Sequence, residues 1–133
     1  MRYDADRQPD AQSWLALDEA ERIDIVVDYH RRTRVKLENA KVHAVAHVIV
    51  ENQIALGAPP MVSATFARLM DEGLDRHDAI HAVGSIVMGV VYDILREPGA
   101  NRNANEQQVN EQYNRRLATL TAASWRAQAD PDD

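Results

Sequence analysis

Two long segments of the chain, residues 43–56 and 79–92, carry almost no charge and constrain the fold more than any other feature. The first segment contains a single charged residue, Glu51, and the second contains no Asp, Glu, Lys or Arg. A helix that is apolar around most of its circumference is surrounded by other helices. The two segments therefore predict a pair of central helices inside an all-α bundle.

Capping signals divide the chain into four main helices and a fifth, amphipathic one. Asp18 with Glu21 is a capping box, Asn39 and Asp75 are caps, and Gly57 is typical of a helix end. No segment alternates strictly between apolar and polar residues, so we expect no strand. The expected helices cover about 18–32, 40–56, 60–72, 76–96 and 104–127.

The 133 residues are enough to bury a core within one domain. We expect residues 1–12, which are polar and contain Pro9, to form a flexible arm. Residues 13–128 are then a single helical domain, and residues 129–133 a disordered acidic tail. The chain has no cysteine, so disulfides and thiolate metal sites are excluded.

The net charge is −6, with acidic residues spread along the chain, and this argues against a nucleic-acid partner. The only basic concentration, within residues 30–36, is more simply a solvated helix end. The start of the chain has no apolar signal segment, and the longest uncharged stretch is shorter than the roughly 20 residues needed to span a bilayer. We therefore expect an acidic, cytoplasmic protein with no membrane partner.

Four of the five histidines form two pairs with the same spacing, His43 with His47 and His77 with His81. Because a helix turns every 3.6 residues, side chains four residues apart project from one face. Two imidazoles so placed can bind one metal ion, as on the H-E-x-x-H helix of metalloproteases. These four histidines are the candidate metal ligands.

The helix order predicts where the pairs meet. Short connections favour antiparallel neighbours, so the second and fourth helices run the same way and their pairs lie at similar heights. His30, at the end of the first helix, reaches the same pole, so we expect all five histidines to gather there. Glu51, eight residues after His43, is either a further ligand or a carboxylate that orients a ligating imidazole.

Imidazole and carboxylate ligands without sulfur suit zinc, iron, nickel or copper. Four histidines in a closed shell would make a structural site. Three histidine ligands would leave an open coordination position on the metal, at which a water molecule could be activated. A metal-dependent hydrolase is therefore one interpretation. The chain has no Glu-x-x-His motif of di-iron bundles, and no nucleotide or haem motif.

An alternative interpretation is a non-enzymatic interaction or dimerisation module. The histidines would then form a structural hydrogen-bond network that fixes the register of the helices. The fifth helix, through Tyr113, Leu117 and Trp125, would dock a partner or a second copy of the chain. A metal site needs ring nitrogens from both pairs to converge on one point, whereas a network would pair them outward with separate groups.

Residues 43–53 and 77–84 resemble a group of small bacterial helical proteins named domain of unknown function 1841. Those proteins also carry H-x3-H before a Glu/Asn/Gln-type segment, and a later H-x3-H on another helix. This chain has Ile80 and Ser85 where the family carries acidic residues around its last histidine. The resemblance implies an all-helical fold and no established activity.

Overall fold

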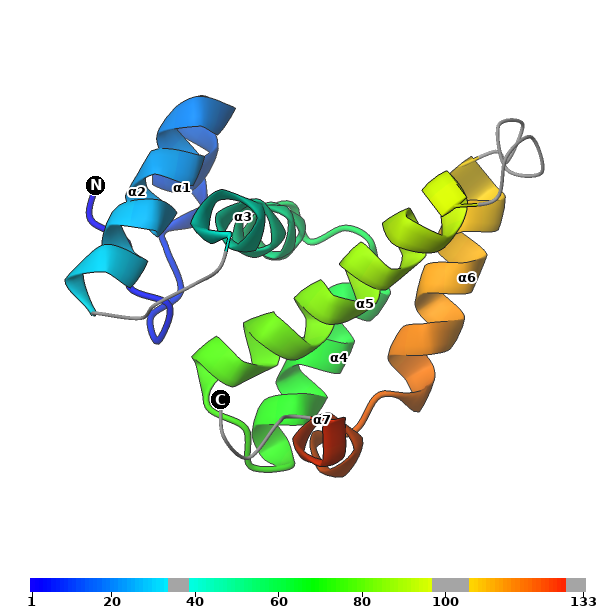
Figure 1. The fold of residues 1–133 in the computed structure, drawn as a ribbon. Helices are drawn as coiled ribbons and strands as arrows, with labels where there is room; N and C mark the ends of the chain where they lie inside the picture. The colour runs from blue at the N-terminus through cyan, green and yellow to red at the C-terminus, as the bar shows by residue number, and fades with distance from the viewer. Residues whose placement is uncertain (34–38, 97–105, 129–133) are drawn as a thin grey trace.

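The computed structural model describes residues 1–33, 39–96 and 106–128, and within these ranges the chain forms helices and no strand (Figure 1). The all-α prediction is confirmed. In chain order the helices are α1 (Ala11–Ala16), α2 (Glu19–Arg32), α3 (Ala40–Leu56), α4 (Pro60–Asp71), α5 (Arg76–Arg96), α6 (Glu106–Thr119) and α7 (Ala122–Gln128).

Local capping sets the start of α2 and both ends of α3, as predicted. Asp18 and Glu21 form a capping box at the start of α2, in which each side chain accepts a hydrogen bond from the backbone N–H of the other. Asn39 caps α3, and Gly57 ends it with a φ of 66°. Glycine adopts this left-handed conformation without a steric penalty.

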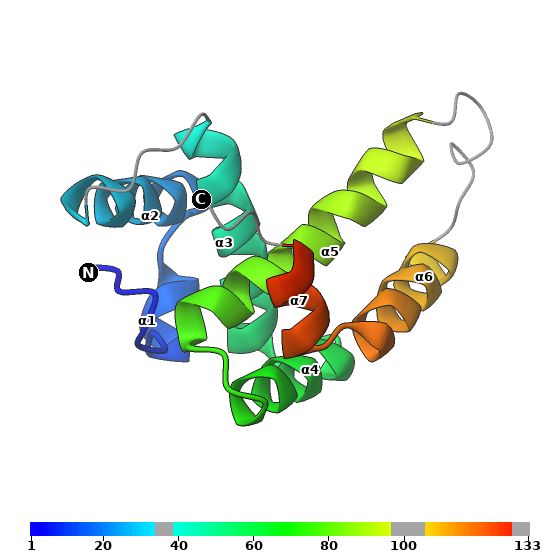
Figure 2. The ribbon, with the colours of Figure 1, turned by 60° about the horizontal axis from the view of Figure 1, so that its bottom comes forward.

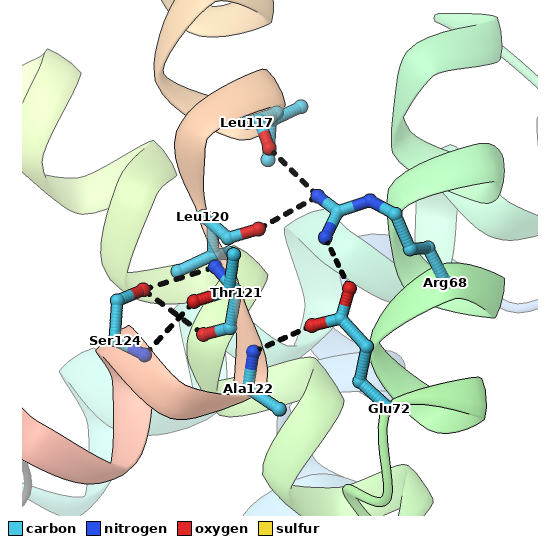
Figure 3. A network of polar contacts seen from close by, with 7 residues as sticks. All are labelled: Arg68, Glu72, Leu117, Leu120, Thr121, Ala122 and Ser124. Carbon is cyan, nitrogen blue, oxygen red and sulfur yellow. Dashed lines mark hydrogen bonds and ion pairs between the residues drawn. The ribbon is translucent and has the colours of Figure 1, made fainter.

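The prediction of one continuous fifth helix is wrong, because the helix is interrupted between the end of α6 at Thr119 and the start of α7 at Ala122. At the break, Thr121 and Ser124 each accept a hydrogen bond from the other's backbone N–H, which starts a new helix (Figure 3). The guanidinium of Arg68 in α4 donates to the carbonyls of Leu117 and Leu120, which end α6. Residues 104 and 105 of the predicted helix lie outside the described residues.

The N-terminal segment is packed rather than loose, which corrects the expectation of a flexible arm over residues 1–12. Tyr3 and Ala5 are buried, and α1 already begins at Ala11. Trp14 of α1 is also buried and donates from Nε1 to the side chain of Asn52 in α3, at 2.8 Å. The segment is polar in overall composition, so the sequence does not indicate that a few of its apolar side chains pack against the helices. The predicted tail, residues 129–133, lies outside the described part of the chain.

α3 and α5 occupy the centre of the molecule, as the two uncharged segments predict. α3 packs against α1, α2, α4 and α5, while α5 packs against α3, α4 and α6 (Figure 2). Gly84 lies at the contact of the two, since a Cβ added there would be 3.6 Å from the Cβ of Ala46. Among the described helices, none combines the length and apolarity needed to cross a membrane.

Candidate metal centre

The five histidines of the chain gather at one place, as the helix order predicts. Each can offer one ring nitrogen such that all five nitrogens lie within 4.8 Å of one another. The closest ring centroids, those of His77 and His81, are 4.3 Å apart, and those of His43 and His81 are 4.5 Å apart. The cluster contains the four predicted ligands and adds His30, which was expected at this pole but not among the ligands.

Three helices supply these side chains. α3 carries His43 and His47, α5 carries His77 and His81, and α2 contributes His30 from its last turn. α3 packs directly against both α2 and α5. The four-residue spacing turns each pair toward the helix contact, so the two pairs and the single histidine face a common centre.

His47 is held by a chain of hydrogen bonds that leads away from the cluster. The hydroxyl of Tyr3 donates its proton to Oε2 of Glu51 at 2.6 Å and lies 3.2 Å from Nδ1 of His47. Because that proton is committed to Glu51, the contact requires Nδ1 of His47 to be the donor. The lone pair of the neutral ring is then on Nε2, which faces the cluster.

The tautomer of His30 is fixed in the same way. Its Nδ1 lies 2.9 Å from the carbonyl oxygen of Val26, one turn earlier in α2. A carbonyl only accepts, so Nδ1 carries the proton and Nε2 carries the lone pair. His30 is 2 % exposed and His47 is 1 % exposed, so both rings are enclosed by protein.

The inward nitrogens are only partly satisfied. Nε2 of His81 lies 3.0 Å from Nε2 of His47, a hydrogen-bonding distance. The Nε2 atoms of His30, His43 and His77 are buried and, within the described structure, have no hydrogen-bond partner. Leaving such a group unpaired costs about 1–3 kcal/mol. Three of the ring nitrogens of the cluster therefore lack a hydrogen-bond partner within the described structure.

Burial keeps the cluster uncharged. It is the main cause that lowers the pKa of each of the five histidines. The pKa of His43 falls to about 4 and that of His81 to about 3, with a further contribution from neighbouring histidines in both cases. The rings are therefore neutral near pH 7, the form of imidazole that binds metal ions.

Glu51 lies outside the histidine cluster and is engaged by other groups. Arg76 donates to both of its carboxylate oxygens, at 2.7 and 2.8 Å, and also to the carbonyl of Ala5. Among the described residues, the Tyr3 hydroxyl is the hydrogen-bonded link between Glu51 and the cluster. Of its two predicted roles, the geometry fits orientation of an imidazole, one hydrogen bond further out than expected, better than direct ligation.

Sequence reasoning missed Arg76 and Tyr3. Arg76 stands next to His77, yet an arginine at a helix start carries no signal that it is buried. Tyr3 lies in the irregular N-terminal segment, and its partners are 44 and 48 residues away in the chain. No local pattern could have found either residue.

The faces predicted for a partner are largely used within the chain. Tyr113 and Leu117 are buried in the protein's own core, and only Trp125 is partly exposed. Docking of a second copy through these side chains stays a prediction, and it would have to rest on Trp125.

Comparison with protein-family models, with curated proteins and with solved structures finds no match to this chain. The resemblance to domain of unknown function 1841 therefore stays a prediction. What the protein does has to be argued from the histidine cluster itself.

Proposed function

We propose that the five-histidine cluster binds one divalent transition-metal ion, and that metal binding is the function of this helical protein. The observation that carries the proposal is a set of three buried Nε2 atoms, those of His30, His43 and His77, that have no partner among the described residues. A metal ion between the rings would give each of these nitrogens a partner.

The distances suit an ion after small side-chain movements. Zinc binds imidazole nitrogen at about 2.0–2.1 Å, which places two nitrogens of a tetrahedral site about 3.4 Å apart. The Nε2 atoms of His47 and His81 are 3.0 Å apart, and the whole set lies within 4.8 Å. To bind one ion, the nitrogens of His47 and His81 would have to move slightly apart and the more distant nitrogens slightly closer.

The outer hydrogen bonds also support a metal. Metal-binding histidines commonly donate their other ring N–H to a carbonyl or a carboxylate, which fixes the tautomer. His30 does so to Val26, and His47 does so to the Tyr3 hydroxyl that is itself bound to Glu51. With imidazole as the only ligand type in the cluster, zinc, iron, nickel and copper are the candidates.

The alternative is a structural hydrogen-bond network without metal. The contact between His47 and His81 fits it, because one Nε2–H could donate to the other ring. The unpartnered nitrogens do not fit it, since a complete network would pair them. The metal interpretation accounts for both observations and is the one we adopt.

Hydrolysis at a metal-bound water would require more than metal binding. Such a reaction needs an open coordination position and a base beside it. The histidine cluster contains no carboxylate, and Glu51 is committed to Arg76. The geometry therefore supports metal binding without a specified reaction.

Elemental analysis of untagged protein, purified without chelator, tests the proposal. We expect close to one equivalent of metal, lost in the His43→Ala/His81→Ala variant, whose two rings come from different helices and are only partly buried. The control is Asp78→Asn, which removes a charge from α5 outside the cluster and should keep the metal. Circular dichroism confirms that each variant is helical.

Two results would overturn the proposal. One is folded protein that contains no metal and takes up none of the four candidate ions on titration. The other is metal content that is equal in the double variant and in the unaltered protein. Either result would favour the hydrogen-bond network.

A further inference from the structure

A cavity of about 430 Å³ lies between α3 and α5 and opens beside the histidine cluster. Its size is within the range of pockets that hold small molecules. Three of the cluster histidines form part of its wall, so a molecule in the cavity would lie next to a bound metal. Its lining residues are Asn39, Val42, His43, Ala46, His47, Ile80, His81, Gly84, Ser85, Met88 and Trp125.

The wall of this cavity offers little to a polar ligand apart from the imidazoles. Among the residues that the structure describes, no Asp, Glu, Lys or Arg lines it. The amide oxygen of Asn39 already accepts from the backbone N–H of Val42, and the hydroxyl of Ser85 donates to the carbonyl of Ala82 at 2.7 Å. The remaining wall is mostly apolar, so the body of a bound molecule must be apolar as well.

The charge of the metal site indicates which chemical group the ligand should carry at the end that faces the histidines. A divalent ion held by neutral imidazoles keeps its full double charge in a buried place, which is costly without an anion. The cluster contains no carboxylate, and the charge of Glu51 is already balanced by Arg76. A negatively charged group on the ligand would supply the counter-charge that the described part of the chain does not place at the cluster.

We propose that the cavity binds a small organic anion, with its apolar body between α3 and α5 and its carboxylate on the metal. This inference rests on the proposed metal site and names the class of molecule that the site accepts. Each methylene buried in the cavity should tighten binding by roughly fourfold at most. A carboxylate with a short alkyl chain is therefore distinguishable from acetate.

Cobalt(II)-loaded protein tests the inference, because the visible absorption of cobalt reports changes among its ligands. Hexanoate, acetate and 1-hexanol are titrated separately. We expect hexanoate to bind at least tenfold more tightly than acetate, and 1-hexanol to leave the spectrum unchanged. Together the probes separate the contribution of the carboxylate from that of the apolar chain.

The variant Ser85→Phe fills the cavity at an exposed position whose hydroxyl contacts only its own helix. We expect it to bind hexanoate no more tightly than acetate, with cobalt content unchanged because Ser85 is not one of the cluster residues. The control Ala67→Phe adds the same ring at an exposed position of α4, away from the cavity, and should behave as the unaltered protein.

The outcomes separate this inference from the proposed function. Protein that takes up neither cobalt nor any of zinc, iron, nickel and copper overturns the metal site and this inference with it. Protein that binds cobalt but has equal affinities for hexanoate and acetate overturns this inference alone. So does a Ser85→Phe variant that retains the preference for hexanoate.

Discussion

At the scale of single residues, Tyr3 joins the histidine cluster to a buried ion pair through one hydroxyl group. Its oxygen accepts from His47, and its proton goes to Glu51, which Arg76 holds from the other side. Burial, and after it the charge of Glu51, raises the pKa of Tyr3, so the hydroxyl keeps its proton. The orientation of a cluster ring thus depends on a residue in the irregular N-terminal segment.

Tyr3→Phe should weaken metal binding about 10–100-fold, because His47 loses the acceptor that fixes its tautomer. Stability should also fall by about 1–3 kcal/mol, since a buried donor is left unpaired. Competition titration with a chelating dye and urea denaturation measure the two effects. The control Tyr113→Phe removes a hydroxyl that donates to Gln53, and should lose stability but keep its metal affinity. Equal metal affinities in the two variants would contradict the role given to Tyr3.

Glu51→Ala should destabilise the protein by about 3–5 kcal/mol in urea denaturation, because it leaves Arg76 buried without its counter-charge. The side chains of this pair are only 1 % and 6 % exposed. In the ion pair of Asp28 with Arg32 they are 50 % and 30 % exposed, so Asp28→Ala should cost less than about 1 kcal/mol. Similar losses in both variants would show that burial of the Glu51 pair contributes nothing.

At the scale of helices, the sequence predicts what depends on local pattern. The ends of α2 and α3 follow from Asp18, Asn39 and Gly57, which act on neighbouring backbone groups. The meeting of the histidines follows from helical spacing and short connections. The break before α7 was missed because the apolar stripe continues through it, and because Arg68, from a distant helix, binds the carbonyls that end α6.

Thr121→Ala should destabilise the protein by about 0.5–2 kcal/mol, because the backbone N–H of Ser124 in the first turn of α7 loses its acceptor. Trp125 lies in the same short helix, so its fluorescence should report the loosening before global unfolding in urea. The control is Thr119→Ala, whose exposed hydroxyl only bonds its own helix and which should change stability by less than about 0.5 kcal/mol. Glu72 of the segment after α4 also accepts from the backbone N–H of Ala122, at 2.8 Å (Figure 3). A Thr121→Ala variant as stable as this control would show that Arg68 and Glu72 fix the break without the Thr121 side chain.

At the scale of the whole molecule, the cluster joins helices that lie far apart along the chain. It is also a group of neutral imidazoles enclosed together, and burial lowers the pKa of each. In the unfolded chain the same rings have pKa values near 6.5. Protonation therefore favours the unfolded state.

Metal-free protein, kept in chelator, should lose stability as the pH falls. Below about pH 6.5 the histidines of the unfolded chain bind protons. In the folded chain they bind protons only at lower pH, because the pKa is about 4 for His43 and about 3 for His81. Each histidine contributes at most about 1.4 kcal/mol per pH unit to the slope. Urea midpoints between pH 7 and pH 5 measure it. The His43→Ala/His81→Ala variant should show a shallower decline, and an equally steep one would contradict this account.

The spacing of the histidines has a consequence for how a metal ion would enter the proposed site. Each pair, on α3 or on α5, is complete as soon as one helix forms, whereas the full set of five exists only after three helices have docked. An ion present during folding therefore meets two incomplete two-nitrogen sites before the complete one. Uptake after folding would avoid this competition, so we expect metal added to folded protein to occupy the five-histidine site more completely than metal present during refolding.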